Sequence, residues 1–351
     1  MKLADLTQRT GQWLGETGAM HDVVISSRAR LARNLAGVPF LSRCSAEQQQ
    51  EIEAMLRDQT LQAGIAAEVF YVDVAAAGEM DRRLLVERHL ISRQHADATV
   101  PRGVAVSGNE TVAIMVNEED HLRIQVLRGG LELAQAVVEI NRIDDLLEQR
   151  VDYAFHKRYG YLTACPTNVG TGLRVSVMLH LPALKMSGEI EKVLRAARDM
   201  RLAIRGLYGE GTEATGDFFQ VSNQTTMGKS EEQIVEEFRG QVIPQFIDYE
   251  RRARQSLLQR RAAAIDDKVQ RAYALLRSAR LISSEETMYL LSLLRLGVNL
   301  GRVSGVDLKA VNELFLLTQP AHLQRLLSRE MSPQERGEAR GEFIRRRLGA
   351  N

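Results

Sequence analysis

Apolar stretches separated by turn-forming residues between positions 103 and 127 predict three consecutive β-strands. The segment reads GVAVSGNETVAIMVNEEDHLRIQVL. Two clusters of turn-forming residues, 107–109 and 117–120, divide the segment into three. Because connections this short join neighbouring strands that run in opposite directions, we expect antiparallel pairing.

Two further strands are predicted at residues 173–181 and 217–224, which read LRVSVMLHL and DFFQVSNQ. Apolar residues at helical spacing predict helices at residues 46–61, 131–150 and 189–201. Strand-rich and helical stretches do not alternate regularly along the chain. The pattern therefore favours an α+β fold with a large antiparallel sheet over a doubly wound parallel sheet.

The pattern changes near residue 230, after which helical periodicity continues and strand signals cease. Ser283 and Glu286 form a predicted capping box, and SPQE from Ser332 supplies a cap, a proline and a glutamate in the favoured order. We expect a C-terminal all-helical domain, joined to the first domain inside a long charged helix near residues 249–261. The predicted domains are residues 1–250 and 251–351.

Composition narrows the class of protein. The 351 residues are 44% hydrophobic and carry a formal net charge of +1, which argues for a sizeable core and against general nucleic-acid binding. There is no apolar run of about 18 residues to span a membrane, and the first residues lack the apolar core of a signal peptide. Cys44 and Cys165 match no zinc-site spacing. We expect a reduced, cytoplasmic protein that binds neither membrane nor nucleic acid and holds no metal of its own.

Five arginines are candidate phosphate ligands. They occur in the segments SSRAR, NEEDHLR, RVSVM and RGLYGEG, at positions Arg28, Arg30, Arg123, Arg174 and Arg205. The planar guanidinium group bonds two phosphate oxygens at once and keeps its charge at neutral pH. The phosphate-loop pattern Gly-x-x-x-x-Gly-Lys-Ser/Thr does not occur in the chain. Phosphate binding is therefore expected to depend mainly on side chains.

Two glutamates are candidates for binding a cationic group beside that phosphate. Glu119 lies in NEEDHLR between two apolar strands, where alternation lets it face a cleft while its neighbours point away. Glu210 lies in RGLYGEG, whose glycines allow close backbone approach. Three acids at a turn are more often a solvated loop, and many glycine-rich stretches are simple turns. A triphosphate beside two carboxylates would suit phosphoryl transfer to a guanidinium group.

Cys165 opens the polar loop CPTNVGTG, where hydroxyl and amide donors and nearby arginines could stabilise a thiolate. Such a thiolate would orient a guanidinium group and need not act as a covalent nucleophile. The simpler alternative is a small buried side chain, the commonest environment of a free cysteine. His89, in ERHLIS, is a candidate contact for a nucleotide base or phosphate, although a single histidine at a helix end is more often structural.

Taken together, these segments resemble the ATP:guanido phosphotransferases, whose members include creatine and arginine kinases. CPTNVGT is similar to the signature loop of that family, and NEEDHLR is similar to its acidic segment. The resemblance implies a catalytic domain with a large antiparallel sheet flanked by helices, and MgATP as the phosphoryl donor. It implies that Glu119 and Glu210 grip the guanidinium, with Cys165 close to it. It also implies a nucleotide site made of Ser26, Ser27, Arg28, Ala29, Arg30, His89, Arg123, Arg174, Val175, Ser176, Val177, Met178, Arg205, Gly206, Leu207, Tyr208, Gly209 and Glu210.

Within that family, the chain is more similar to the bacterial kinases that phosphorylate arginine side chains of proteins. Small-molecule guanidino kinases carry a helical domain before the SSR-type segment, which begins here at Ser26. This chain instead has a helical extension after the catalytic segments, and GLYGEGTEATGDFFQVSNQ is closer to the bacterial group. The resemblance implies protein substrates with exposed arginines, and an activator protein and a stress-response protease as partners. A homodimer is one assembly that we consider for the chain.

One segment departs from that bacterial group, whose members often carry Arg-Asp-x-x-Arg-Ala near the end of the chain, linked to phosphoarginine sensing. The matching stretch here reads RGEARG, so Arg336 and Arg340 remain while glycine replaces the aspartate and the alanine. We therefore expect a degenerate sensing segment.

Residues and resemblance together lead us to expect a protein arginine kinase that acts in a bacterial stress response and marks proteins for proteolysis. Glu210 is the expected base and Glu119 the clamp, although the reverse assignment fits the same pattern. Two alternatives stay open: a kinase for a small free guanidino metabolite, and a catalytically silent phosphoarginine-binding adaptor. An open acceptor site would favour a protein substrate, whereas a lid over the site would favour the metabolite.

Overall fold

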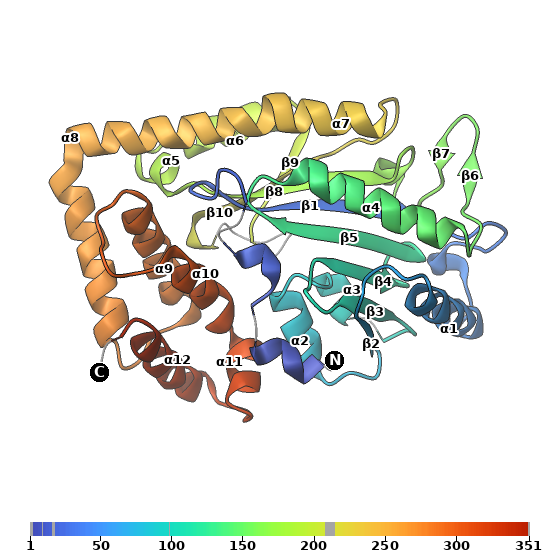
Figure 1. Ribbon diagram of the computed structural model, residues 1–351, viewed down its shortest axis with the longest axis horizontal. Coiled ribbons are helices and arrows are strands. Elements are labelled where there is room, and N and C mark those ends of the chain that lie inside the picture. Colours follow the sequence, from blue (N-terminus) through green and yellow to red (C-terminus); the bar gives the residue numbers. More distant parts are fainter. Residues whose placement is uncertain (1–2, 9, 16–17, 98, 208–214, 350–351) are drawn as a thin grey trace.

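The protein is built around an antiparallel sheet of eight strands with helices packed against it (Figure 1). The computed structural model describes residues 3–8, 10–15, 18–97, 99–207 and 215–349. In these ranges the strand order is β2-β3-β4-β5-β1-β8-β10-β9. The strands of this sheet are β1 (Val24–Arg33), β2 (Val69–Asp73), β3 (Gly103–Ser107), β4 (Val112–Val116), β5 (Leu122–Gly129), β8 (Leu173–His180), β9 (Leu202–Arg205) and β10 (Phe218–Asn223). A separate small hairpin consists of β6 (Phe155–His156) and β7 (Gly160–Tyr161).

The five strands predicted from the sequence are confirmed as β3, β4, β5, β8 and β10. The antiparallel pairing is confirmed too, because β3 pairs with β4 and β4 pairs with β5. Sequence reasoning missed β1, which lies at the centre of the sheet, because its serines and arginines are poor indicators of a buried strand. It also missed β2 and β9, which are short and lie at the two edges.

One face of the sheet is covered by the main hydrophobic core. Helix α4 (Leu133–Glu148) lies over β1 and β5, and α1 (Ala46–Gln62) packs against β2, β3 and β4 (Figure 1). Alternate strand residues that are at most 1% exposed point into this core, among them Ala29, Leu31, Ile124, Val175 and Val221. Since side chains alternate along a strand, the intervening residues point to the other face, where the polar groups of β1 collect.

The helices predicted at 46–61, 131–150 and 189–201 are confirmed as α1, α4 and α6 (Ile190–Asp199). Four further short helices in this part of the chain are α2 (Glu79–Glu87), α3 (Arg93–Asp97), α5 (Pro182–Met186) and α7 (Glu231–Glu237). Short 3₁₀ segments are η1 (Leu3–Gln8), η2 (Gln12–Leu14), η3 (Leu41–Arg43), η4 (Pro166–Asn168) and η5 (Thr215–Asp217), and a π-helical turn, η6 (Phe238–Val242), leads into α8.

The predicted helical C-terminal region is confirmed. It consists of α8 (Ile243–Ser278), α9 (Ser284–Asn299), α10 (Leu308–Leu317), α11 (Pro320–Leu326) and α12 (Pro333–Arg347). The Ser283 hydroxyl accepts a 3.0 Å bond from the amide of Glu286, which is one half of the capping box predicted there, whereas Ser332 and Glu335 make the full reciprocal capping box. These bonds satisfy amide groups that a helix start otherwise leaves without partners.

Helix α8 connects the sheet region to the C-terminal helices. Its backbone leaves helical geometry at Arg261, with φ −146° and ψ 37°, and Figure 1 shows the helix changing direction before it reaches α9 and α12. The helix runs through the position of the predicted boundary between residues 250 and 251, which stays a prediction. In the described part of the chain, no helix has both the length and the apolar character needed to cross a membrane.

A second hydrophobic cluster attaches the C-terminal helices to the sheet. Leu127, Met178 and Phe218, which lie on the face opposite to the main core, pack in one cluster with residues of α9 and α10. Phe218 and Phe315 of α10 meet edge to face, with ring centroids 4.7 Å apart. The C-terminal helices therefore cover one end of the same sheet face that carries the polar groups of β1.

A buried ion pair fixes the end of β1 to helix α4. The Nη2 atom of Arg33 lies 2.6 Å from Oδ2 of Asp144, and Nε also bonds this carboxylate. The same guanidinium group donates to the carbonyl oxygen of Thr171 at 2.9 Å and lies 3.6 Å from the ring centroid of Tyr161. The loop that precedes β8 is therefore anchored to the core through Arg33.

Replacing Asp144 with alanine should lower the free energy of unfolding by about 3–5 kcal/mol, because it leaves the buried charge of Arg33 without compensation. The measurement is urea unfolding followed by circular dichroism. Asp248→Ala is the matched control, since its partner Arg252 is 71% exposed and such a pair contributes about 1 kcal/mol or less. Equal small losses for both variants would contradict the anchoring role of the buried pair.

Candidate active site

The register of the sheet gathers five arginines on the face opposite to the main core. On β1, Arg28 and Arg30 are two residues apart and therefore point to the same face. Arg30 lies directly opposite Arg174 on β8. Arg123 comes from β5, on the other side of β1, and Arg205 comes from the end of β9. We call these five residues the arginine cluster.

Arg30 lies between the other members of the arginine cluster. It is only 7% exposed, and its Nε and Nη2 atoms have no hydrogen-bond partner among the described residues. Burial lowers the pKa of Arg30 well below its usual value, and the charges of Arg123, Arg28, Arg174 and Arg205 lower it further. Burial and the charge of Arg123 likewise lower the pKa of Arg28 to about 10. An anion placed here would relieve this repulsion and satisfy the buried N–H groups.

Glu118 binds one edge of the arginine cluster. Its Oε1 atom lies 2.6 Å from Nη1 of Arg123 and accepts a 2.6 Å hydrogen bond from Oγ of Ser92. Burial works against ionisation, but the charge of Arg123 and these hydrogen bonds outweigh it and lower the pKa of Glu118 to about 2. A single carboxylate offsets only part of the charge of five guanidinium groups. Sequence reasoning selected Glu119 from this segment and missed its neighbour Glu118.

Two cavities adjoin along the arginine cluster. The first, of about 280 Å³, we call the arginine cavity; besides the arginines it is lined by polar residues that sequence reasoning missed, namely Ser92, Gln94, Gln125 and Gln220. The second, of about 350 Å³, we call the Cys165 cavity; its lining includes Glu119, Asp120, Cys165, Thr167 and Arg174. The residues that line both cavities are Arg30, Gln94, Glu118, Arg123 and Arg205. A ligand in either cavity would therefore contact the same guanidinium groups.

Cys165 lies at the surface of its cavity and is only partly buried. Its Sγ atom is 3.0 Å from Oγ1 of Thr167, which accepts a 3.2 Å hydrogen bond from Nη2 of Arg174. The start of the loop is held by Asp120, whose Oδ1 accepts a 2.6 Å bond from the amide of Ala164. The thiol is therefore linked through one hydroxyl group to the arginine cluster, and the alternative of a buried apolar cysteine does not describe it.

Glu119, one of the two predicted carboxylates, is exposed at the edge of the Cys165 cavity. Partial burial raises the pKa of Glu119, and the negative charges of Asp120 and Glu118 raise it further. The other predicted carboxylate, Glu210, lies outside the described residues together with Tyr208 and Gly209. Only one carboxylate of the predicted pair can therefore be placed in the cavity.

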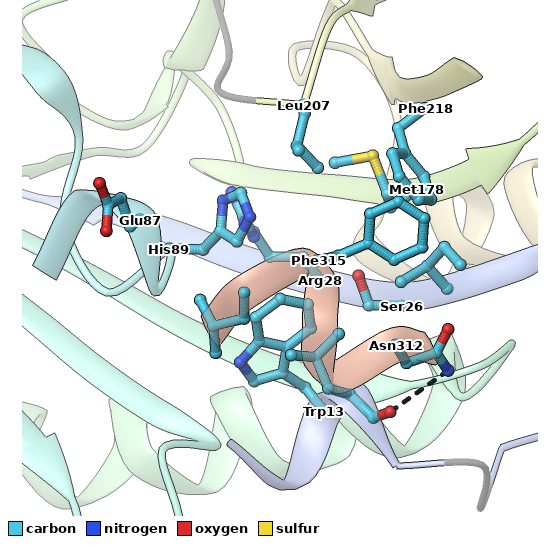
Figure 2. Close-up of a pocket in the computed structure, with 13 residues that line it drawn as sticks. Trp13, Ser26, Arg28, Glu87, His89, Met178, Leu207, Phe218, Asn312 and Phe315 are labelled. Atoms are coloured by element: carbon cyan, nitrogen blue, oxygen red, sulfur yellow. Dashed lines mark hydrogen bonds between the residues drawn. The ribbon is translucent and has the colours of Figure 1, made fainter. Parts of the chain in front are cut away.

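A third cavity, largely apolar, adjoins the arginine cavity (Figure 2). The two share Arg28, His89 and Leu207. Ser26 and Met178, which the sequence also placed in the nucleotide site, line this apolar cavity. Burial and the charge of Arg28 lower the pKa of His89 to about 3, so its imidazole ring is neutral near pH 7. A polyanionic ligand in the arginine cavity could therefore place an apolar part of itself in the third cavity, next to the neutral imidazole ring of His89.

Other residues predicted for the nucleotide site do not line the three cavities. Three belong to the main core on the opposite face: Ala29, Val175 and Val177. The Ser27 hydroxyl donates to the carbonyl oxygen of Gly130 at 2.8 Å and accepts a 3.1 Å bond from the amide of Glu132. Ser176 is buried opposite Arg28, and Gly206 is buried next to Leu207. These residues hold the strands that carry the cavity lining.

The predicted degenerate segment near the end of the chain lies on α12, outside the three cavities. The guanidinium group of Arg340 is buried and donates to the carbonyl oxygens of Thr318 and Ile282, each at 2.9 Å. Arg336 donates to the carbonyl oxygen of Met331 at 2.7 Å. A β-carbon at Gly341 would lie 2.9 Å from the carbonyl oxygen of Ala279. The glycine therefore lets α12 pack closely against the backbone at Ala279, and the guanidinium group of Arg340 is occupied by hydrogen bonds to backbone carbonyl oxygens.

Possible metal ligands do not cluster in the described ranges: no group of three or more His, Cys, Asp or Glu side chains there is arranged to hold a metal ion.

Comparison with known proteins agrees with this geometry. Residues 50–253 match the model of the ATP:guanido phosphotransferase C-terminal catalytic domain, and residues 262–351 match that of the protein-arginine kinase McsB C-terminal domain. Among solved structures, a duplicated taurocyamine kinase from Schistosoma mansoni is 26% identical with a TM-score of 0.60, covering 70% of this chain and 35% of that one. A lombricine kinase is 26% identical with a TM-score of 0.56, covering 70% of both chains.

Curated relatives extend the match to nearly the whole chain. The protein-arginine kinase of Symbiobacterium thermophilum is 47% identical over 349 residues, which cover 98% of each chain. Those of Halothermothrix orenii and Bacillus subtilis are 44% and 43% identical; the first match covers 99% of both chains, and the second covers 96% of this chain and 93% of the relative. The chain therefore belongs to the ATP:guanido phosphotransferase family, within its protein-arginine kinase branch.

Proposed function

We propose that the cleft transfers the γ-phosphoryl group of ATP to the guanidinium group of an arginine in a protein substrate. The arginine cavity would bind the phosphates, and the Cys165 cavity would bind the acceptor side chain. The observation that carries this proposal is Arg30, a buried guanidinium surrounded by four others with two N–H groups that lack partners among the described residues. Such a group is stabilised by a polyanion held in the cleft.

The phosphate side would act by positioning and by electrostatic stabilisation. Guanidinium groups fixed on strands are preorganised, so little rearrangement is needed as charge develops on the transferring phosphoryl group. The described residues supply no ligand set for a metal ion, and we propose that Mg²⁺ arrives bound to the phosphate oxygens of ATP. Mg²⁺ would add positive charge at the same oxygens that the arginine cluster contacts.

The acceptor side must make a guanidinium group reactive, since its pKa above about 12 leaves it protonated and a poor nucleophile. We propose that Glu119 clamps the N–H edge of the acceptor and that Glu210 takes its proton, with Cys165 as an orienting group. The raised pKa of Glu119 also makes it a competent proton acceptor, so the two glutamates could exchange roles. Direct attack by the acceptor nitrogen on phosphorus needs no phosphorylated cysteine.

The biological setting that we propose follows from the resemblance of the sequence to bacterial protein arginine kinases. It is a cytoplasmic stress response in which an activator protein stimulates the kinase, a protease removes the marked proteins, and the kinase acts as a homodimer. Arg336 and Arg340 would form a degenerate phosphoarginine-sensing segment, because Arg340 already bonds two carbonyl oxygens. A free guanidino metabolite as acceptor and a silent phosphoarginine-binding adaptor are the competing proposals.

Glu119→Ala should lower kcat by about 10²–10⁴ while leaving the Kd for ATP within a factor of about two, because this carboxylate faces the acceptor cavity. Transfer is measured as acid-labile phosphate on an arginine-rich protein, and ATP binding by calorimetry. Glu148→Ala, which removes an exposed carboxylate at the end of α4, should change neither quantity. Near-normal turnover by Glu119→Ala would contradict its role as a clamp.

Arg30→Ala should weaken ATP binding and transfer together, by about tenfold or more each, because a charge-assisted bidentate contact is lost. Arg30→Lys keeps the charge but loses the planar fork, so it should recover only part of the affinity. Both are measured by calorimetry with ATP and by steady-state kinetics. Full recovery with lysine would show that charge alone matters and that the proposed bidentate geometry is wrong.

The enzyme should use arginine within a polypeptide with a kcat/KM at least tenfold above that for free arginine. Glu119 at the edge of the cavity is exposed, and the β6–β7 hairpin, which precedes the Cys165 loop in the chain, presents Phe155 and Tyr159, which are 58% and 44% exposed. A polypeptide can gain affinity from such surface outside the reacting group, whereas free arginine cannot. The measurement compares free arginine with an unfolded arginine-containing protein; equal or better use of free arginine would restore the metabolite alternative.

A further inference from the structure

The apolar cavity has walls from three parts of the chain that are distant in sequence. Met178 comes from the sheet, Trp13 from the N-terminal segment η2, and Phe315 from helix α10 of the C-terminal region. Figure 2 shows these side chains around the cavity, with His89 and Arg28 on the same lining. Two of the walls therefore lie outside the segments that carry the arginine cluster.

The chemistry of these walls suits a flat heteroaromatic ring. Trp13 meets the neutral ring of His89 edge to face, with centroids 5.3 Å apart and planes at 79°. Phe315 is held in the same way against Phe218. Aromatic faces and the Met178 thioether make favourable contacts with π-systems. Because Arg28, His89 and Leu207 belong to both cavities, a nucleotide with its phosphates in the arginine cavity would direct its base here; the cavity has a volume of about 30 Å³, so its side chains would have to separate to admit the base.

The turn that presents His89 is also fixed by the C-terminal region. The Glu87 carboxylate accepts hydrogen bonds of 2.8 Å from the amides of Ala321 and His322 at the start of α11. Arg88 is fully buried, with Nη1 2.7 Å from Nε2 of His322. His89 itself follows with a positive φ of 58°, a conformation that its surroundings must hold in place. Helix α10 therefore lines the cavity through Phe315, and α11 holds the turn that carries His89 on the same lining.

We propose that Phe315 and Trp13 are nucleotide-binding residues that complete the base pocket, so that docking of the C-terminal helices and binding of ATP stabilise each other. This proposal rests on the proposed function, because it requires the phosphates of ATP in the arginine cavity. The sheet alone offers the triphosphate site with one side of the base pocket open. Any ligand that shifts α10 would by the same linkage change the affinity for ATP.

Trp13 supplies a direct test, because it is the single tryptophan of the chain. ATP should change the intensity or wavelength of its fluorescence, whereas inorganic tripolyphosphate, which has no base, should bind without that change. Calorimetry with both compounds reports binding independently of the fluorescence. Binding of ATP with no change in fluorescence would overturn the placement of the base against Trp13 and leave the proposed phosphoryl transfer intact.

Variants of Phe315 test the second wall. Phe315→Leu keeps apolar bulk but loses the ring, and it should raise the Kd and KM for ATP by about 3- to 10-fold with kcat nearly unchanged. Tripolyphosphate binding should be unaffected. Phe315→Ala should show a larger effect in the same direction. Leu314→Ala is the matched control, because Leu314 is a buried residue of the same helix that does not line the cavity.

The outcomes separate this inference from the proposed function. A loss of ATP affinity in the Phe315 variants that is clearly larger than the loss in Leu314→Ala, with tripolyphosphate binding unchanged, supports the base pocket. Unchanged ATP affinity in Phe315→Leu overturns it. A loss of ATP affinity in Leu314→Ala that exceeds the loss in Phe315→Leu also overturns it, because loosening of α10 alone would then account for the effect of the Phe315 variants. Failure of the unaltered protein to bind either ATP or tripolyphosphate would instead refute the proposed function.

Discussion

Repulsion between arginines on neighbouring antiparallel strands is the constraint on which the rest of the structure depends. Arg30 and Arg174 lie opposite each other, an arrangement that destabilises a sheet when nothing offsets it. The residues that follow them, Leu31 and Val175, are buried in the main core on the other face. A slip of one residue would exchange the two faces, so the core that fixes the register also holds the charges together. The fold thus maintains a site that is unfavourable until an anion arrives.

The acceptor side of the cleft is positioned by different contacts. The loop that carries Cys165 is attached through Asp120 to the connection between β4 and β5, and through Arg33 to the buried Asp144. Neither attachment passes through the arginine cluster. The two halves of the site therefore have separate attachments to the core. They meet along the residues that line both cavities and at the hydrogen bond from Arg174 to Thr167.

The residues that bind phosphate could be predicted from side-chain chemistry, whereas the walls that remote segments contribute to the apolar cavity could not. The arginines were identified because few other side chains bind phosphate with such geometry, and β3 to β5 were identified from short apolar stretches separated by turn-forming residues. Alternation does not decide which of Glu118 and Glu119 turns inward, because both lie in the connection between two strands. Trp13 and Phe315 carry no local signal at all: each resembles an ordinary core residue, and only the packing of remote segments brings them to the same cavity.

The order of synthesis gives the attachment of the C-terminal helices a further consequence. The sheet is complete once β10 has left the ribosome, yet Leu127, Met178 and Phe218 are covered by helices that are translated later. At about 5–20 residues per second, the stretch from β10 to the end of α10 takes roughly 5–20 seconds to make. During that interval the nascent chain displays an apolar strip beside a strongly basic one. The speed of translation through α8 and α9 therefore governs how long the half-made enzyme can associate with the wrong partner.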